Sequence, residues 1–270
     1  MTLSIGLGLG AGMAVAGGGG PPAFAPTDVS GLLLWVDPSD LTTITESGGL
    51  VSQLDDKSGN ANHMEQATGS MQPDTGTVTI NGLNALAFDG ADDRLDTDGN
   101  PFGANVVDAL VLILYRVNAV ANSKLFSLTG DAASSTTWHA ACPFGDGNVY
   151  FDTNDGGGAI RADGATGFST GEVHLVGFYG TSTDNEQEVW IDGVLLDAAG
   201  SGQSVPTTSK GVMIGGISGS TYTHMDLCEM IVVDGTVSES DRQKLEGYLA
   251  HKWGQEGSLP GGHPYKSEAP

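Results

Sequence analysis

The sequence has few positive charges. It holds 10 Lys and Arg against 33 Asp and Glu, so its formal net charge at pH 7 is -23. A surface with this charge repels nucleic-acid phosphates and anionic lipids, which argues against DNA, RNA or a membrane as partner. We interpret the acidity as a means of staying soluble or as adaptation to salty surroundings, ahead of a dedicated cation-binding role.

Cysteine is also scarce. Cys142 and Cys228 are the only two, too few for a scaffold held together by disulfides, and neither lies in a CxxC or His-rich segment. We predict that both are buried free thiols, with a disulfide between them as the alternative.

Long uninterrupted hydrophobic runs are missing as well. Residues 1–26 carry no charge, but glycine interrupts them too often for a transmembrane helix. Residues 14–16 resemble a signal-peptidase site, although no Lys or Arg precedes them. We favour a flexible apolar arm that becomes ordered against a partner protein. Its expected contact residues are Leu3, Ile5, Leu7, Leu9, Met13, Val15 and Phe24.

From residue 27 onward, short apolar segments alternate with Gly, Asn and Asp, as in antiparallel β-proteins. Asp192-Gly193, between two such segments, predicts a two-residue hairpin. The other predicted strands include residues 31–36, 83–88, 110–115, 124–128, 148–151, 173–179, 188–191, 211–214 and 228–233. The pattern predicts an all-β domain over residues 27–266, built as an antiparallel two-sheet sandwich.

One segment has a helical period. Ser238 is a candidate N-cap, Leu245, Leu249 and Trp253 form an apolar stripe, and Gly254 is a natural stop. The sequence therefore predicts one closing helix over residues 238–253.

Five sequence blocks carry a family resemblance. They are TVSESDRQKLEGYLAHKWG with SLPGGHPY (236–254 and 258–265), GLLLWVDPSD (31–40), LDDKSGN (54–60), LAFDGADD (86–93) and VWIDG (189–193). Together they resemble concanavalin A-like lectin/glucanase domains of the laminin-G-like type, common in bacteriophage virion proteins and bacterial surface proteins. The resemblance implies a jelly-roll sandwich, and it is specific for fold rather than for function.

The resemblance implies a non-enzymatic virion protein: a phage head or tail decoration, spike or fibre component whose lectin-like domain binds host surface glycans. The arm would then contact other virion proteins on the surface of the head or tail. A homo-oligomer, with a trimer as the expected state, is also implied. The alternative is an extracellular bacterial carbohydrate-binding module, secreted or surface-anchored and Ca²⁺-dependent.

Catalytic motifs are missing. The glucanase pattern Glu-x-Asp-x-x-Glu is absent, Glu188 and Asp192 would lie about 13 Å apart along a strand, and Asp226 and Glu229 would face opposite sides. There is no Gly-x-Ser-x-Gly elbow and no phosphate-binding loop. The sequence therefore predicts that the protein is not an enzyme.

Sugar binding needs aromatic faces beside amide and carboxylate groups. The candidate residues are Trp138, His139, Asn148, Tyr150, Asp152, Asn154 and, in a second loop, Tyr222. The alternative is that Trp138 and Tyr150 point into the core.

Two loops partly match a calcium-binding pattern. Asp96, Asp98 and Asn100 alternate oxygen donors, as do residues 152–155 with Asp163, but each loop lacks a ligand and turn formation explains both. We therefore predict no cofactor, with Ca²⁺ as the alternative that related domains suggest.

Overall fold

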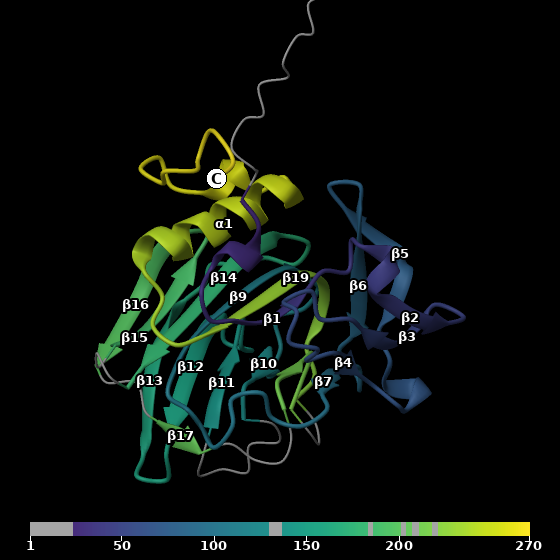
Figure 1. Ribbon diagram of the computed structural model, residues 1–270, viewed down its shortest axis with the longest axis horizontal. Helices are drawn as coiled ribbons and strands as arrows, with labels where there is room; N and C mark the ends of the chain where they lie inside the picture. Colours follow the sequence, from purple (N-terminus) through teal and green to yellow (C-terminus); the bar gives the residue numbers. More distant parts are fainter. Residues whose placement is uncertain (1–23, 130–136, 183–185, 201–203, 207–210, 218–220) are drawn as a thin grey trace, which may run out of the picture.

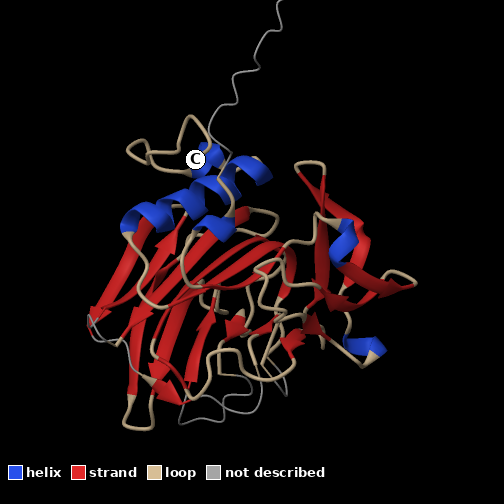
Figure 2. Cartoon of the chain, viewed as in Figure 1, coloured by secondary structure: helices blue, strands red, loops and turns tan. Residues whose placement is uncertain are grey.

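The computed structural model describes residues 24–129, 137–182, 186–200, 204–206, 211–217 and 221–270. Strands dominate these ranges, and one long helix follows the last strand (Figure 2). Of the predicted arm contacts, Phe24 alone lies within the described residues.

The elements have the following bounds. The strands are β1 (Leu32–Val36), β2 (Ile44–Ser47), β3 (Leu50–Leu54), β4 (Met64–Glu65), β5 (Asp74–Ile80), β6 (Leu83–Asp89), β7 (Leu95–Thr97), β8 (Asn105–Val106), β9 (Asp108–Val117), β10 (Phe126–Ser127), β11 (Thr137–Ala141), β12 (Asn148–Asn154), β13 (Ala159–Ala165), β14 (Val173–Thr181), β15 (Glu186–Ile191), β16 (Val194–Gly200), β17 (Val205–Pro206), β18 (Met213–Ile214) and β19 (His224–Asp234). The α-helix is α1 (Glu239–Trp253), and short 3-10 helices span Pro26–Asp28, Leu41–Thr43, Gly69–Met71 and Glu256–Ser258.

The strand pairings are antiparallel and fall into two sets. The first runs β16–β15–β14–β9–β19, and β19 also pairs with β1 and with β6, which pairs with β5. The second runs β13–β12–β11–β10–β18–β7–β4–β3–β2. One residue pair, Leu50 with Asp74, joins β3 to β5. The result is one curved, nearly barrel-shaped network of 17 strands (Figure 1), with β8 and β17 forming a separate small sheet.

Strand β9 shows where the core lies. Val111, Ile113 and Tyr115 point to a large apolar cluster to which both strand sets contribute. Leu112 and Leu114 point the other way, into a second cluster that α1 shares. A strand buried on both faces is a continuous apolar run in the sequence, which is why β9 is the most hydrophobic segment of the chain.

The predicted helix is confirmed. The Ser238 side chain accepts a hydrogen bond from the Asp241 amide at 3.1 Å, and Gly254 ends the helix with a φ of 69°. Its apolar stripe is buried in the second cluster. The ring of Phe24 packs edge-on against Tyr248 of this helix, so this residue of the expected arm is held by the domain itself. Within the described residues, no helix is both long and apolar enough to cross a bilayer.

The predicted hairpin is also confirmed. Asp192 and Gly193 have φ values of 50° and 77° between β15 and β16, the left-handed pair that a type I′ turn requires. Cys142 and Cys228 are buried free thiols, as predicted.

The all-β antiparallel prediction is therefore confirmed. All strands except β8 and β17 are joined in one connected network, and the two-sheet sandwich stays a prediction. The jelly-roll connectivity and the boundaries of the domain at residues 27 and 266 stay predictions.

Candidate functional site

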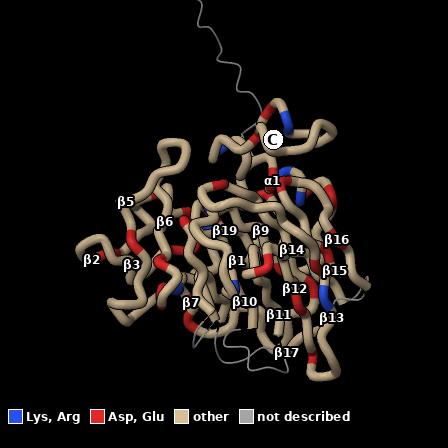
Figure 3. Tube along the Cα trace, turned by 180° about the vertical axis from the view of Figure 1, so that it is seen from behind, with Lys and Arg blue, Asp and Glu red and all other residues tan. Residues whose placement is uncertain are grey.

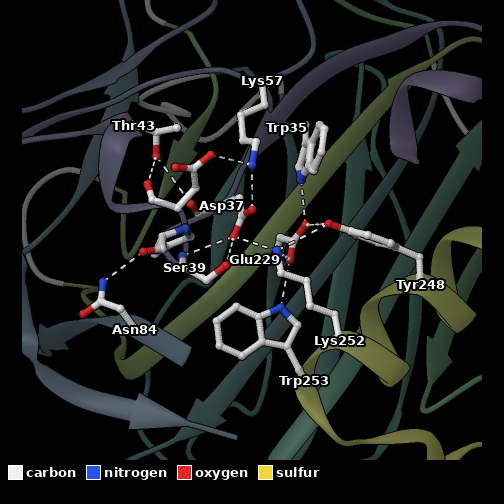
Figure 4. A network of polar contacts seen from close by, with 12 residues as sticks. Trp35, Asp37, Ser39, Thr43, Lys57, Asn84, Glu229, Tyr248, Lys252 and Trp253 are labelled. Carbon is white, nitrogen blue, oxygen red and sulfur yellow. Dashed lines mark hydrogen bonds and ion pairs between the residues drawn. The ribbon is translucent and has the colours of Figure 1, made fainter. Parts of the chain in front are cut away.

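Two of the blocks that carry the family resemblance converge on one buried carboxylate, Glu229 of β19 (Figure 4). Its Oε1 accepts hydrogen bonds from Trp35 Nε1 at 2.6 Å and from the Tyr248 hydroxyl at 3.0 Å. Its Oε2 accepts from Lys252 Nζ at 2.7 Å and Trp253 Nε1 at 2.8 Å. The donors come from β1 and α1, so this carboxylate fastens the helix to the sheet.

A second carboxylate extends this network. Asp37 lies 2.7 Å from Lys252 and 2.9 Å from Lys57. Burial raises the pKa of Asp37, but Lys252, Ser39 and Lys57 outweigh it, so its pKa lies below the ordinary 3.8. Burial also raises the pKa of Glu229, and Lys252 only partly offsets this. Glu229 and Asp37 form their hydrogen bonds and ion pairs with neighbouring side chains beneath the helix. These contacts therefore stabilise the fold and leave the two carboxylates without a free position for a ligand.

Trp138, the central aromatic residue of the predicted sugar site, is fully buried. The alternation of β11 points its ring into the first core cluster, where it lies 4.6 Å from the ring of Phe151. A ring in this position offers no face to a sugar. The binding prediction for Trp138 is therefore wrong, and the core alternative holds for this residue.

The predicted residues of β12 lie on the other face of the strand. Tyr150 is half-buried there, so the core alternative is wrong for this residue. Its hydroxyl donates to Asp146 at 2.6 Å and accepts from the Asn148 amide at 3.2 Å. The guanidinium of Arg161 lies 4.6 Å from the centre of its ring. Asn154 caps its own turn by accepting from the Gly156 amide at 2.9 Å.

His139 and Asp152 are directly opposite one another on β11 and β12, and Arg161 is opposite Asp152 on β13. Arg161 donates to both carboxylate oxygens of Asp152, at 2.6 and 2.8 Å. The structure thus brings four of the seven candidate residues, His139, Asn148, Tyr150 and Asp152, to one sheet face.

Tyr222 lies beside that face rather than in it. Its ring packs against Gly216, where a side chain would collide with it. The adjacent carbonyl of Thr221 accepts from the Lys124 amide at 2.9 Å, and the Lys124 ammonium lies 2.6 Å from His139 Nε2. Lys124 therefore connects the two predicted loops.

Within the described residues, neither predicted calcium loop brings three His, Cys, Asp or Glu ligand atoms close together. Asp152 is held by Arg161 and Asn154 by its own turn. A different acidic group has oxygens within 4.8 Å of one another: Asp89, Asp92 and Asp93. Burial, together with the charges of neighbouring acids, raises the pKa of Asp93 to about 7 although it accepts a hydrogen bond from the Asp89 amide.

The sequence did not predict a pocket of about 390 Å³ between the first turn of α1 and the outer face of β14–β16. Its walls include two aromatic rings and four charged side chains: Tyr179, Glu186, Glu188, Trp190, Glu239 and Arg242. Three carboxylates in one concavity provide acceptors for hydroxyl groups.

Contacts around the pocket hold its aromatic wall in place. Trp190 Nε1 donates to Glu188 Oε2 at 2.8 Å, and the guanidinium of Arg242 lies 3.5 Å from the centre of the Trp190 ring. Arg242 also donates to the buried Glu246 at 2.6 Å, and Glu246 lies 3.1 Å from His263 Nε2. This chain of contacts leaves Arg242 and Trp190 little freedom, so the pocket is pre-organised.

A signal for this pocket was present in the sequence. Glu186, Glu188 and Trp190 alternate along one strand, which places all three on the same face. From the sequence, Glu188 was considered together with Asp192 as a candidate catalytic pair. Asp192 instead lies in the hairpin, 2.8 Å from His174 Nδ1. Arg242 is distant in sequence, and no local pattern places it over Trp190.

No protein-family model matches the sequence, and no curated protein matches it significantly. Solved structures do match. Domain 4 of AbnA, a GH43 extracellular arabinanase from Geobacillus stearothermophilus, in complex with arabinotriose, has a TM-score of 0.58 at 13% identity, covering 78% of this chain and 95% of that one.

Two toxin domains are similar as well. The binding domain of Paraclostridial Mosquitocidal Protein 1 has a TM-score of 0.58 at 14% identity over 83% of this chain and 53% of that one. The ligand-binding domain of botulinum neurotoxin serotype D, in complex with N-acetylneuraminic acid, has a TM-score of 0.53 at 11% identity over 80% and 50%. This chain thus spans about half of each toxin chain, and at such identities the likeness shows the fold alone.

Proposed function

We propose that this chain is a non-enzymatic glycan-binding module of the concanavalin A-like class and that the pocket beneath α1 binds neutral saccharides. The observation that carries the proposal is the pocket itself, in which a fixed Trp190 ring stands beside Glu186, Glu188 and Glu239. An aromatic surface for the apolar face of a sugar and carboxylates for its hydroxyls are what saccharide recognition requires. The matched arabinanase domain, in complex with arabinotriose, supports a neutral saccharide, and the neurotoxin domain, in complex with N-acetylneuraminic acid, supports glycan binding in general.

The arrangement of the acids favours binding over hydrolysis. Glu186 and Glu188 are two residues apart on one strand face, which separates them by about 7 Å. That separation falls within the range of inverting glycosidases, but such enzymes place their carboxyls on opposite sides of the scissile bond. β15 (EQEVWI) also lacks the Glu-x-Asp-x-x-Glu spacing by which glucanases place their acids from a single strand.

We further propose a role in a virion, which is supported only by the sequence resemblance and by the apolar arm at residues 1–26. Co-purification with phage particles would support it. If the protein is found outside the cell with the arm removed by cleavage, the bacterial carbohydrate-binding module is favoured instead.

The test is calorimetric titration with arabinotriose, cellotriose and maltotriose. We expect at least one to bind the wild type, and Glu186→Gln and Trp190→Ala to weaken that binding by about tenfold or more. Glu268→Gln, which changes an exposed acid at the C-terminus, is the matched control and should bind like the wild type. If all three sugars fail to bind, or if the pocket variants bind normally, the proposal is wrong; release of shorter sugars would reveal an enzyme.

A further inference from the structure

We propose that Lys124 forms an oxyanion-binding subsite on the outer face of β11 and β12, where it takes the carboxylate or sulfate group of an acidic saccharide. The ligand class rests on the glycan-binding function proposed above. The site is separate from the pocket beneath α1, and it has the opposite local charge.

The first argument comes from the partners of the cations. Figure 3 shows acidic positions spread over the trace and basic ones few. Among the Lys and Arg residues in the described ranges, seven lie within 4 Å of a carboxylate: Lys57, Arg94, Arg116, Arg161, Arg242, Lys244 and Lys252. Lys266 donates instead to the carbonyls of Gly257 and Leu259. Among the described residues, Lys124 has neither a carboxylate nor a carbonyl as a partner for its ammonium, in a protein with more than three acids for each base.

The second argument is the side chain that Lys124 does contact. Its ammonium lies 2.6 Å from His139 Nε2, and since an ammonium only donates, this nitrogen accepts. The ring proton is therefore on Nδ1, which is buried without a hydrogen-bond partner among the described residues. Burial, followed by the charge of Lys124, lowers the pKa of His139 to about 4, so the ring is neutral at neutral pH.

The third argument is local charge balance. Asp152 and Arg161 are the charged groups that act on Lys124, and they act in opposite directions. Asp152 is already held by the two hydrogen bonds from Arg161. The cluster of Lys124, Asp152 and Arg161 therefore carries one net positive charge. Burial lowers the pKa of the half-buried ammonium, Asp152 opposes this, and Arg161 adds to it by a smaller amount. An anion bound here would supply the missing counter-charge.

The surroundings fit a saccharide. Tyr150 is two residues from Asp152 on the same strand face, about 7 Å away, which is the reach of one sugar ring. Its hydroxyl and the Asn148 amide supply groups for sugar hydroxyls. The pocket beneath α1, with Glu186, Glu188 and Glu239 in its walls, would repel an acidic sugar, so an acidic ligand needs a separate contact of this kind.

The test compares trigalacturonate and galactose 6-sulfate with neutral galactose by NMR titration at low salt. Lys124→Gln should weaken binding of both acidic probes by about tenfold or more, because a charge-assisted hydrogen bond is lost. Lys124→Arg should keep most of the affinity. Lys244→Gln, which removes the same charge from a lysine paired with Asp241 on α1, is the matched control and should bind like the wild type. In the wild type, the pKa of the Lys124 ammonium should rise when either probe binds.

Unchanged affinity in Lys124→Gln would overturn the proposal. An equal loss in Lys244→Gln would reduce the effect to general electrostatics, and equal binding of a DNA oligonucleotide would remove the saccharide assignment. Titration with arabinotriose separates the Lys124 subsite from the pocket beneath α1. If Lys124→Gln still binds arabinotriose, the pocket beneath α1 is intact in this variant. If the wild type fails to bind it but binds trigalacturonate through Lys124, the pocket proposal fails and this one stands.

Discussion

Glu229 satisfies four donors from two distant segments with one carboxylate. Two tryptophan indoles, a tyrosine hydroxyl and a lysine ammonium all end on its two oxygens (Figure 4). Removing one partner from a buried charged network costs more than the network itself contributes, because the remaining groups stay buried and unpaired.

Glu229→Ala should lower the free energy of unfolding by about 3–5 kcal/mol. Tyr248→Phe removes one donor and should cost about 1 kcal/mol. Urea denaturation measures both, with Glu268→Ala as a surface control expected within about 0.5 kcal/mol of the wild type. A Glu229→Ala midpoint equal to that of the control would show that the network does not fasten the helix.

His174 predicts a pH dependence. Burial lowers its pKa, but Asp192 at 2.8 Å and Glu172 at 3.4 Å outweigh this and hold the pKa above the ordinary 6.5. A histidine with a raised folded-state pKa contributes its full stability below the unfolded-state pKa and loses it as pH rises through the folded-state value. The melting temperature of the wild type should therefore exceed that of His174→Gln by more at pH 5.5 than at pH 8.5. A constant difference would contradict the assignment.

Among the elements, α1 has the clearest sequence signals, and its N-cap can be tested directly. Ser238→Ala should lower the free energy of unfolding by about 1 kcal/mol, because the Asp241 amide loses its side-chain acceptor. Ser240→Ala changes an exposed serine in the same turn and should have little effect. If denaturant unfolding shows that Ser238→Ala and Ser240→Ala lower the free energy of unfolding by the same amount, Ser238 is not acting as a cap.

Local sequence patterns correctly predicted the elements that depend mainly on neighbouring residues. The cap, stripe and stop of α1, the Asp192-Gly193 turn and the continuous run of β9 all stand in the sequence as they do in the fold. β11 was not predicted as a strand, because a five-residue segment buried throughout has no apolar–polar alternation, and the sequence left both a binding and a core position open for its Trp138.

At the scale of the whole molecule, the candidate site could be predicted only in part. The cross-strand alignment of His139 with Asp152 follows from neighbouring strands, and the sequence grouped these residues correctly. The pocket beneath α1 requires Arg242 of the helix to meet Trp190 of β15, which is decided by how the helix crosses the sheet. Two family blocks contain Trp190 and Arg242, but neither block shows from its sequence that the two side chains meet.

The most direct test of the central claim, glycan binding beneath α1, is NMR observation of the indole N–H groups during titration with arabinotriose. The chain has four tryptophans, of which Trp35, Trp138 and Trp253 are buried. Trp190 lines the pocket through a ring whose N–H donates to Glu188. The Trp190 signal should move and saturate while the other three stay in place. Saturable binding that leaves the Trp190 signal unmoved would contradict the account.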